Sequence, residues 1–238
     1  MSSYYFNDSF RFLEKDYQVI FYDQRGSGFS QIKPDLKYYH FDELVKELEA
    51  VRKEVLMEDK ITVIGHSFGG LLALRYAIDY AKHIDKMILI SSLPAKAPGR
   101  RKTIDFRSLL NLLPPEMANK VATQGGYLLL RGTFYDKKNY NKLRLGYTSY
   151  ATSEAVSESF TGYDYSRELG QSSVKTLIIY GEADIFSEEV PKALHQLIHD
   201  SRLVKFNKSG HWVFLEEPDR CRKDWLRQRP CAAARCGW

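Results

Sequence analysis

The sequence has few cysteines, and all three of them (Cys221, Cys231 and Cys236) lie near its end. Residues 1–220 therefore contain none, and a body of that size without cysteine needs no disulfide framework. The spacing of the three cysteines matches no metal-ligand pattern. We expect three free thiols on a loose tail, and neither a metal nor an organic cofactor.

Long apolar runs are also absent. No run approaches the roughly 18 residues that a membrane span requires, and no signal-peptide stretch follows Met1–Tyr5. These absences argue against a membrane protein and predict a cytoplasmic location. The net charge is +5, but residues 221–238 carry +4 of it and leave +1 for the body. A nearly neutral body is not typical of a protein that binds nucleic acid.

What the sequence does contain is enough apolar residues, 44% of 238, for one substantial core. Short β-branched or aromatic runs predict five buried strands, at Gln18–Tyr22, Ile61–Ile64, Met87–Ile90, Leu177–Tyr180 and Leu203–Phe206. Apolar residues at helical spacing predict helices within residues 41–55, 71–80 and 190–198. Strands that alternate with helices predict an α/β fold, with a mostly parallel sheet covered by helices on both faces.

This alternation stops between Pro94 and Gly170, where the chain contains ten Phe or Tyr residues. One interpretation is an inserted helical lid over a pocket, because aromatic side chains give large apolar contacts. The other is that these rings pack only against each other and the sheet. The predicted organisation is a core of residues 1–93 and 171–220, a lid of residues 94–170 and a basic, cysteine-containing tail of residues 221–238.

The segment Gly65-His66-Ser67-Phe68-Gly69 lies between a predicted strand and a predicted helix. A Gly-x-Ser-x-Gly motif in that context is typical of a nucleophile elbow, in which a sharp turn exposes the serine hydroxyl. Ser67 is then the candidate nucleophile, and the backbone N–H of Phe68 is a candidate oxyanion-hole donor. The alternative is an ordinary serine that caps the helix.

A serine nucleophile needs a base, and the sequence offers six histidines. Only His211 follows the last predicted strand, at the end of the sheet where α/β proteins place their sites. The acid that orients the base is expected after the preceding strand, in Gly181-Glu182-Ala183-Asp184. We favour Asp184, with Glu182 as the competitor. The order Ser, Asp, His is the one expected for this fold.

Together with Ser209-Gly210-His211-Trp212 and the turn Tyr22-Asp23-Gln24-Arg25-Gly26-Ser27-Gly28, these motifs resemble the α/β-hydrolase superfamily. The turn is most similar to the proline iminopeptidase-like branch. The resemblance runs from about Tyr5 to Asp219 and implies the α/β-hydrolase fold and a serine hydrolase.

The sequence also differs from the family pattern in two places. Family members have further strands and a His-Gly-rich oxyanion loop before the strand that Gln18–Tyr22 matches, and this sequence has no such segment. We expect these N-terminal strands and the loop to be missing, a gap beside Ile61–Ile64, and a chain of doubtful activity. At the other end, Cys221, Trp225 and Leu226 begin the apolar stripe of an expected closing helix, but Pro230 and the residues after it do not continue the stripe, which suggests a truncated or frame-altered end.

The resemblance implies cleavage of short peptides after an N-terminal proline, through an acyl-enzyme on Ser67. A carboxylesterase acting on small esters is the alternative, as is a non-catalytic fragment that keeps the triad residues. Haloalkane- or epoxide-opening relatives are disfavoured, because they have an aspartate where this chain has Ser67. Glu154 and Glu158 could bind the ammonium group of a peptide, or could be two solvated helix charges. The expected partner is the substrate alone; the oligomeric state stays open.

Overall fold

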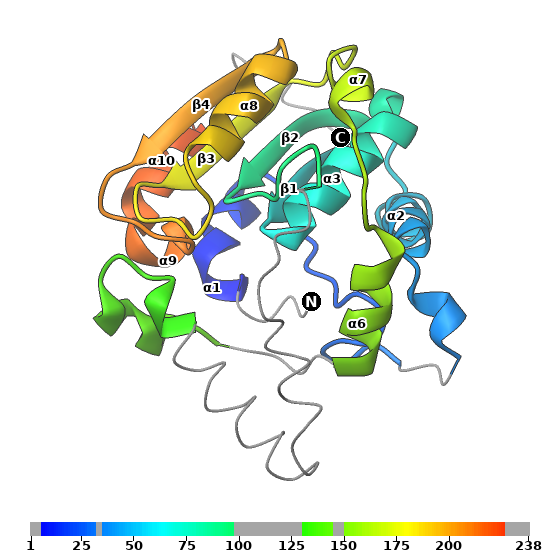
Figure 1. Ribbon diagram of the computed structural model, residues 1–238, viewed down its shortest axis with the longest axis horizontal. Helices are drawn as coiled ribbons and strands as arrows, with labels where there is room; N and C mark the ends of the chain where they lie inside the picture. Colours follow the sequence, from blue (N-terminus) through cyan, green and yellow to red (C-terminus); the bar gives the residue numbers. More distant parts are fainter. Residues whose placement is uncertain (1–5, 32–34, 98–129, 145–149, 227–238) are drawn as a thin grey trace, which may run out of the picture.

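The computed structural model describes residues 6–31, 35–97, 130–144 and 150–226. Within these residues, the centre of the molecule is a parallel sheet in the order β1-β2-β3-β4 (Figure 1). The strands are β1 (Ile61–His66), β2 (Ile84–Ile90), β3 (Thr176–Gly181) and β4 (Ser201–Phe206). Four of the five predicted strands are confirmed, and each extends a few residues beyond its predicted bounds.

The three predicted helices are confirmed as well. The α-helices of the described residues are α1 (Asn7–Phe10), α2 (Phe41–Ala50), α3 (Phe68–Asp79), α6 (Tyr150–Ser159), α7 (Ser166–Leu169), α8 (Glu189–Leu197), α9 (Val213–Glu216) and α10 (Pro218–Leu226). Helix α2 continues as a π-helix, η4 (Val51–Leu56), and 3₁₀ turns form η2 (Arg11–Lys15), η3 (Leu36–Tyr39), η5 (Ala81–His83) and η6 (Lys137–Lys142). None of the helices in these ranges is long and apolar enough to cross a membrane.

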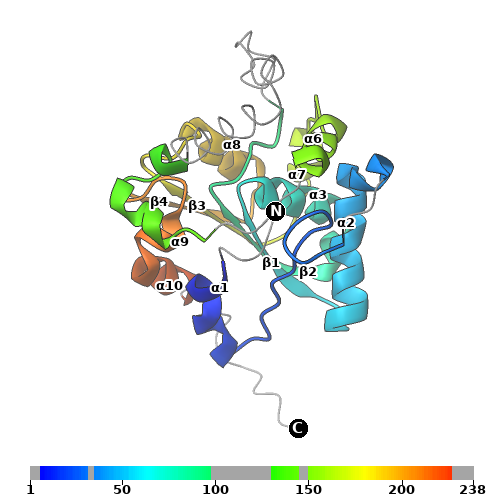
Figure 2. The same ribbon diagram turned by 90° about the horizontal axis from the view of Figure 1, so that it is seen from below.

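Helices cover both faces of the sheet. Figure 2 shows α2, α3 and α8 on one side and α1, α9 and α10 on the other. Each face has its own apolar cluster, and successive residues of a strand alternate between them. In β2, Met87 and Leu89 join the cluster of α2 and α3, whereas Ile88 and Ile90 join the cluster of α9 and α10. This alternation explains why the strands read as continuous apolar runs in the sequence.

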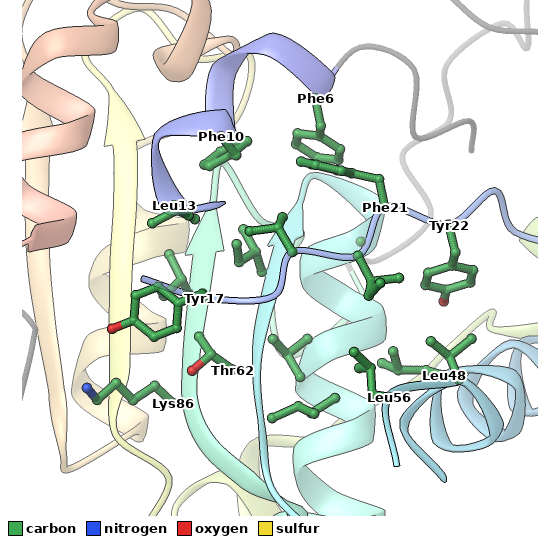
Figure 3. A pocket seen from close by; sticks show the side chains of 18 of the residues that line it. Phe6, Phe10, Leu13, Tyr17, Phe21, Tyr22, Leu48, Leu56, Thr62 and Lys86 are labelled. Carbon is green, nitrogen blue, oxygen red and sulfur yellow. The ribbon is translucent and has the colours of Figure 1, made fainter. Parts of the chain in front are cut away.

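The prediction of a strand at Gln18–Tyr22 is wrong. This segment has no regular secondary structure and lies next to β1 without pairing with it (Figure 3). A cavity of about 560 Å³ separates the two, with Tyr17–Tyr22 on one wall and Ile61–Ile64 on the other. Among the described residues no strand pairs with the outer edge of β1. Because a strand needs a neighbouring backbone to bond to, the apolar run of Gln18–Tyr22 stays irregular.

The turn after this segment is fixed by polar contacts with α2 and with η3 before it. The guanidinium of Arg25 forms an ion pair with Glu47 at 2.5 Å and donates a hydrogen bond to the carbonyl of Tyr38. Gly26 has a positive φ of 77°, and a Cβ there would lie only 2.7 Å from the hydroxyl of Thr152 on α6. The motif that carries the family resemblance therefore joins the N-terminal segment to α2 and α6.

The C-terminal helix α10 corrects a second expectation. The sequence predicts free thiols on a loose tail from residue 221 onward, but α10 runs through that boundary. Cys221 is a free thiol that is only 2% exposed, and Trp225 packs with it against Phe10. Burial raises the pKa of the Cys221 thiol to about 12. Residues 227–238 lie outside the described residues.

The interval that the sequence assigns to a lid is described in part, because residues 98–129 and 145–149 lie outside the described ranges. At its end, the ring of Phe160 contacts the rings of Phe41 and Phe68, with centroids 5.2 and 5.5 Å apart. The aromatic residues that follow α6 thus pack on the helices next to the predicted nucleophile.

Candidate active site

Ser67 stands at a sharp corner between β1 and α3. Its backbone has φ 53° and ψ −118°, which is strained for a residue with a side chain. The corner is tight enough that a Cβ on Gly65 would overlap the carbonyl oxygen of Gly69. This is the geometry that the Gly-x-Ser-x-Gly spacing requires, and such strain is typical of functional sites.

Bonds to the next strand hold the corner in place. The N–H of Ser67 donates to the carbonyl of Ile90 at 3.0 Å, and the carbonyl of Ser67 accepts from Leu93 at 3.3 Å. Phe68 is the first residue of α3, so its N–H has no acceptor within the helix. An N–H at that position, at the positive end of the helix dipole, can bind a developing oxyanion.

Asp184 and His211 meet at the carboxyl ends of β3 and β4. The Nδ1–H of His211 donates to Oδ1 of Asp184 at 2.8 Å, and the side chains are only 6% and 2% exposed, respectively. Burial by itself would raise the pKa of Asp184. The hydrogen bond and the nearby charge of His211 outweigh burial, so the pKa is lowered. The carboxylate therefore stays ionised and fixes the tautomer of the imidazole.

Ser91 is a functional candidate that the sequence analysis missed. It follows β2 with φ 46°, and its buried hydroxyl has no hydrogen-bond partner in the described part of the chain but lies close enough to Asp184 to help lower the pKa of that carboxyl. A strained, buried serine at the end of a strand has no distinctive sequence pattern. Ser91 is found only in the structure, where the ends of β2 and β3 lie side by side.

His66, which the sequence analysis treats as a spacer of the elbow, touches the candidate base. Its Nε2–H donates to the carbonyl of His211 at 2.9 Å, and the two ring centroids are 4.7 Å apart. Burial and the nearby His211 lower the pKa of His66 to about 3, so the ring is neutral. This contact brings the corner that bears Ser67 next to His211.

The remaining candidates lie apart from this pair. Glu182 forms an ion pair with Lys205 at 3.1 Å, and both side chains are exposed. Glu154 and Glu158 lie on α6, half-buried and exposed respectively. In the described part of the chain, the structure brings none of the three carboxylates to His211.

Other histidines make local contacts. His40 accepts from the N–H of Asp42 at the start of α2, and a ring nitrogen of His195 bonds to the hydroxyl of Ser201. Across the described ranges, no group of three or more His, Cys, Asp or Glu side chains could hold a metal ion.

Comparisons with known proteins identify the family of this chain. The family described as "alpha/beta hydrolase fold" matches residues 1–218. The proline iminopeptidase of Saccharolobus solfataricus is 30% identical over 228 residues, covering 85% of this chain and 72% of the relative. The proline iminopeptidase of Thermoplasma volcanium is also 30% identical over 228 residues, covering 87% of this chain and 77% of the relative.

Solved structures support the same fold. An esterase from Exiguobacterium antarcticum superposes with a TM-score of 0.74 at 23% identity, covering 95% of this chain and 87% of the other. A bromoperoxidase from Bacillus anthracis superposes with a TM-score of 0.75 at 21% identity, again covering 95% and 87%.

Proposed function

Because this chain belongs to the α/β-hydrolase family and is a hydrolase, we propose that it cleaves acyl bonds through an acyl-enzyme on Ser67. His211 removes the proton of the Ser67 hydroxyl as the oxygen attacks a carbonyl carbon, and passes that proton to the leaving group. Water then attacks the acyl-enzyme in the same way. Asp184 orients the imidazole and stabilises the imidazolium as it forms.

The observation that carries this proposal is the buried hydrogen bond of 2.8 Å between His211 and Asp184, beside the strained corner of Ser67. A surface ion pair would not keep one tautomer of the ring in place. A carboxylate that is 2% exposed with a lowered pKa can do so throughout the neutral pH range. The N–H of Phe68 supplies one donor for the oxyanion, and Glu182 is left out because it pairs with Lys205.

A fluorophosphonate probe tests the chemistry, because it reacts with serines that a base activates. We expect one labelled residue, lost in Ser67→Ala and strongly slowed in His211→Ala. Ser30→Ala, which alters a serine in the turn before α2, is the matched control and should label normally. Labelling that survives Ser67→Ala would contradict the assignment. Absence of labelling in the unmodified chain would favour a non-catalytic fragment.

For the substrate class, we propose the removal of an N-terminal residue, proline in particular, from short peptides. The names of the two relatives support this choice, and each is 30% identical to this chain over the aligned residues. An N-terminal ammonium needs an acidic partner, and Glu154 and Glu158 on α6 are the candidates. Carboxylic ester hydrolysis is the alternative that the test must separate.

The test compares proline arylamides with their N-acetylated forms, which lack the ammonium. We expect the free amines to be cleaved faster, by about tenfold or more, since a hydrogen bond to a charged group contributes about 1.5–3 kcal/mol. Glu154→Gln or Glu158→Gln should remove that preference, whereas Glu168→Gln on α7 should keep it. Equal rates on both substrates, or activity on simple esters alone, would favour the esterase.

A further inference from the structure

The loop that bears His211 is bound by the segment Leu130–Tyr135, which comes from the interval that the sequence assigns to the lid. The carbonyl of Thr133 accepts the N–H of His211 at 2.8 Å. Its hydroxyl oxygen accepts the indole N–H of Trp212 at 2.7 Å. The same hydroxyl donates to the carbonyl of Leu130 at 2.6 Å. One threonine thus contacts two consecutive residues of the loop.

The two segments meet backbone to backbone. A Cβ on Gly210 would overlap the carbonyl oxygen of Thr133 and would lie about 3 Å from the backbone of Phe134 and Tyr135. Only glycine fits there, so the segment cannot shift without disturbing the residue before His211. The rings of Phe134 and Trp212 stack at 5.8 Å with an angle of 15°, and both are almost fully buried.

These contacts complete the restraints on His211. Its ring nitrogen Nδ1 is bound by Asp184, its carbonyl by His66, and its N–H by Thr133. The three partners come from three separate parts of the chain. The positions of Asp184 and His66 are set by the strands β3 and β1, whereas the position of Thr133 depends on the geometry of its own turn. The N–H of Thr133 donates to the carbonyl of Leu130 at 3.1 Å, and the hydroxyl adds a second bond to that carbonyl and ties the turn to Trp212.

We propose that Thr133 is a positioning residue for His211, and that its hydroxyl keeps the segment Leu130–Tyr135 in the place where its carbonyl binds the N–H of the base. This proposal rests on the proposed function, because it gives Thr133 a role in the reaction of Ser67. It also means that the lid interval contributes to the alignment of the base. Because the Thr133 hydroxyl is already bonded to Leu130 and Trp212, we expect the residue to act on turnover and not on affinity.

The experiment compares Thr133→Val, which keeps the shape and loses the hydroxyl, with Thr133→Ser, which keeps the hydroxyl. For Thr133→Val we expect kcat to fall by about tenfold to a hundredfold with KM within twofold, since a displaced catalytic group costs rate of that order. Thr133→Ser should recover most of the loss. Thr176→Val is the matched control, because the Thr176 hydroxyl also donates to a nearby carbonyl, at 2.8 Å, but at the start of β3.

Nuclear magnetic resonance gives a readout that does not depend on turnover. The sequence has three tryptophans, so the indole N–H region is simple, and Trp212→Phe assigns the resonance of Trp212. Thr133→Val should shift that resonance and the ring ¹⁵N resonances of His211, while Thr176→Val should move neither. Trp212→Phe removes the same hydrogen bond from the other side, so Thr133→Val should add little to its effect on kcat.

The outcomes separate the two proposals. If Thr133→Val is folded and shifts the Trp212 resonance but leaves kcat and the His211 resonances unchanged, the positioning role is overturned. Equal losses of kcat in Thr133→Val and Thr133→Ser would overturn it as well. If the unmodified chain neither labels nor hydrolyses, the proposed function fails. The His211 resonances then decide alone whether Thr133 positions that ring. If Thr133→Val does not fold, the same comparison is made between Trp212→Phe, which loses the hydrogen bond to the Thr133 hydroxyl, and Thr133→Ser, which keeps a hydroxyl there.

Discussion

The segments Gln18–Tyr22 and Leu177–Tyr180 look alike in the sequence and differ in the structure. Each is a short run of β-branched and aromatic residues that ends in a polar turn. Leu177–Tyr180 lies in β3, bonds to β2 on one side and β4 on the other, and is almost fully buried. Gln18–Tyr22 pairs with no strand in the described residues, and a cavity separates it from β1.

A strand depends on its neighbours as much as on its own residues. Backbone groups of Leu177–Tyr180 are satisfied by two adjacent strands, and its side chains fill both apolar clusters. For Gln18–Tyr22, β1 is too far away to bond. Apolar periodicity reports which residues avoid water, but it does not report whether a partner backbone is present.

The comparison extends to the site. Asp184 follows β3, which pairs on both sides, and His211 follows β4, which pairs with β3, whereas Ser67 follows β1, whose outer edge faces the cavity. The pairing of β3 with β4 should make the geometry of Asp184 and His211 robust, whereas truncations within Gln18–Tyr22 should cost little stability.

The largest expected effect is that of Asp184→Asn, which should lower kcat by a factor on the order of 10⁴. The amide favours the wrong tautomer of His211 and removes the negative charge opposite the imidazolium. Steady-state kinetics on a proline arylamide or an ester measure the loss. Glu182→Gln is the matched control, because that carboxylate pairs with Lys205, and should stay within a few-fold of the unmodified chain. A greater loss in Glu182→Gln than in Asp184→Asn would reverse the assignment.

In β3, which pairs with a strand on each side, Leu177→Ala should lower the free energy of unfolding by about 2–5 kcal/mol. Leu177 is fully buried, and the strands on both sides leave little freedom for the cavity to collapse. Urea denaturation measures the change. A loss below about 1 kcal/mol would mean that the core around β3 is looser than the structure indicates.

Next in size is the acid sensitivity that His66 should cause. Its pKa is lowered from 6.5 to about 3 in the folded chain, mainly by burial. The unfolded chain therefore binds a proton on His66 at a higher pH than the folded chain does. The stability contribution of the neutral ring is complete above pH 6.5 and is lost as the pH falls toward 3.

His66→Gln keeps a donor for the carbonyl of His211 but does not titrate. Between pH 7.5 and 4.5, the unmodified chain should lose about 3 kcal/mol more unfolding free energy than this variant. Urea denaturation at the two pH values gives both differences. His195→Gln, at an exposed histidine of α8, is the control and should lose as much as the unmodified chain. Parallel losses in the unmodified chain and His66→Gln would refute the assigned cause.

Much of this molecule could be predicted from the sequence, because the features involved are local. Ser67 is marked by two glycines and its position between a strand and a helix, and His211 and Asp184 by the strands that they follow. The sequence places Cys221 on an apolar stripe with Trp225 and Leu226, but nothing in it indicates that this stripe packs near Phe10, close to the other end of the chain. Thr133 and Trp212 are 79 residues apart, and nothing in either segment indicates that they meet.

The smallest expected effect returns to the unpaired segment. Ile20→Ala should lower the free energy of unfolding by less than about 1 kcal/mol, whereas the same kind of truncation in β3 costs several times more. Ile20 is 38% exposed, and it already faces the cavity beside β1. Truncating its side chain therefore enlarges an existing space and removes few packing contacts, so the usual penalty for a new cavity is largely absent. Urea denaturation of Ile20→Ala beside Leu177→Ala gives the ratio of the two losses. Amide hydrogen exchange provides an independent check, since the amides of Val19–Tyr22 should exchange much faster than those of Leu177–Tyr180. If Ile20→Ala proves as costly as Leu177→Ala and the two sets of amides are equally protected, Gln18–Tyr22 is packed and hydrogen-bonded like a strand, and the contrast between the two segments fails.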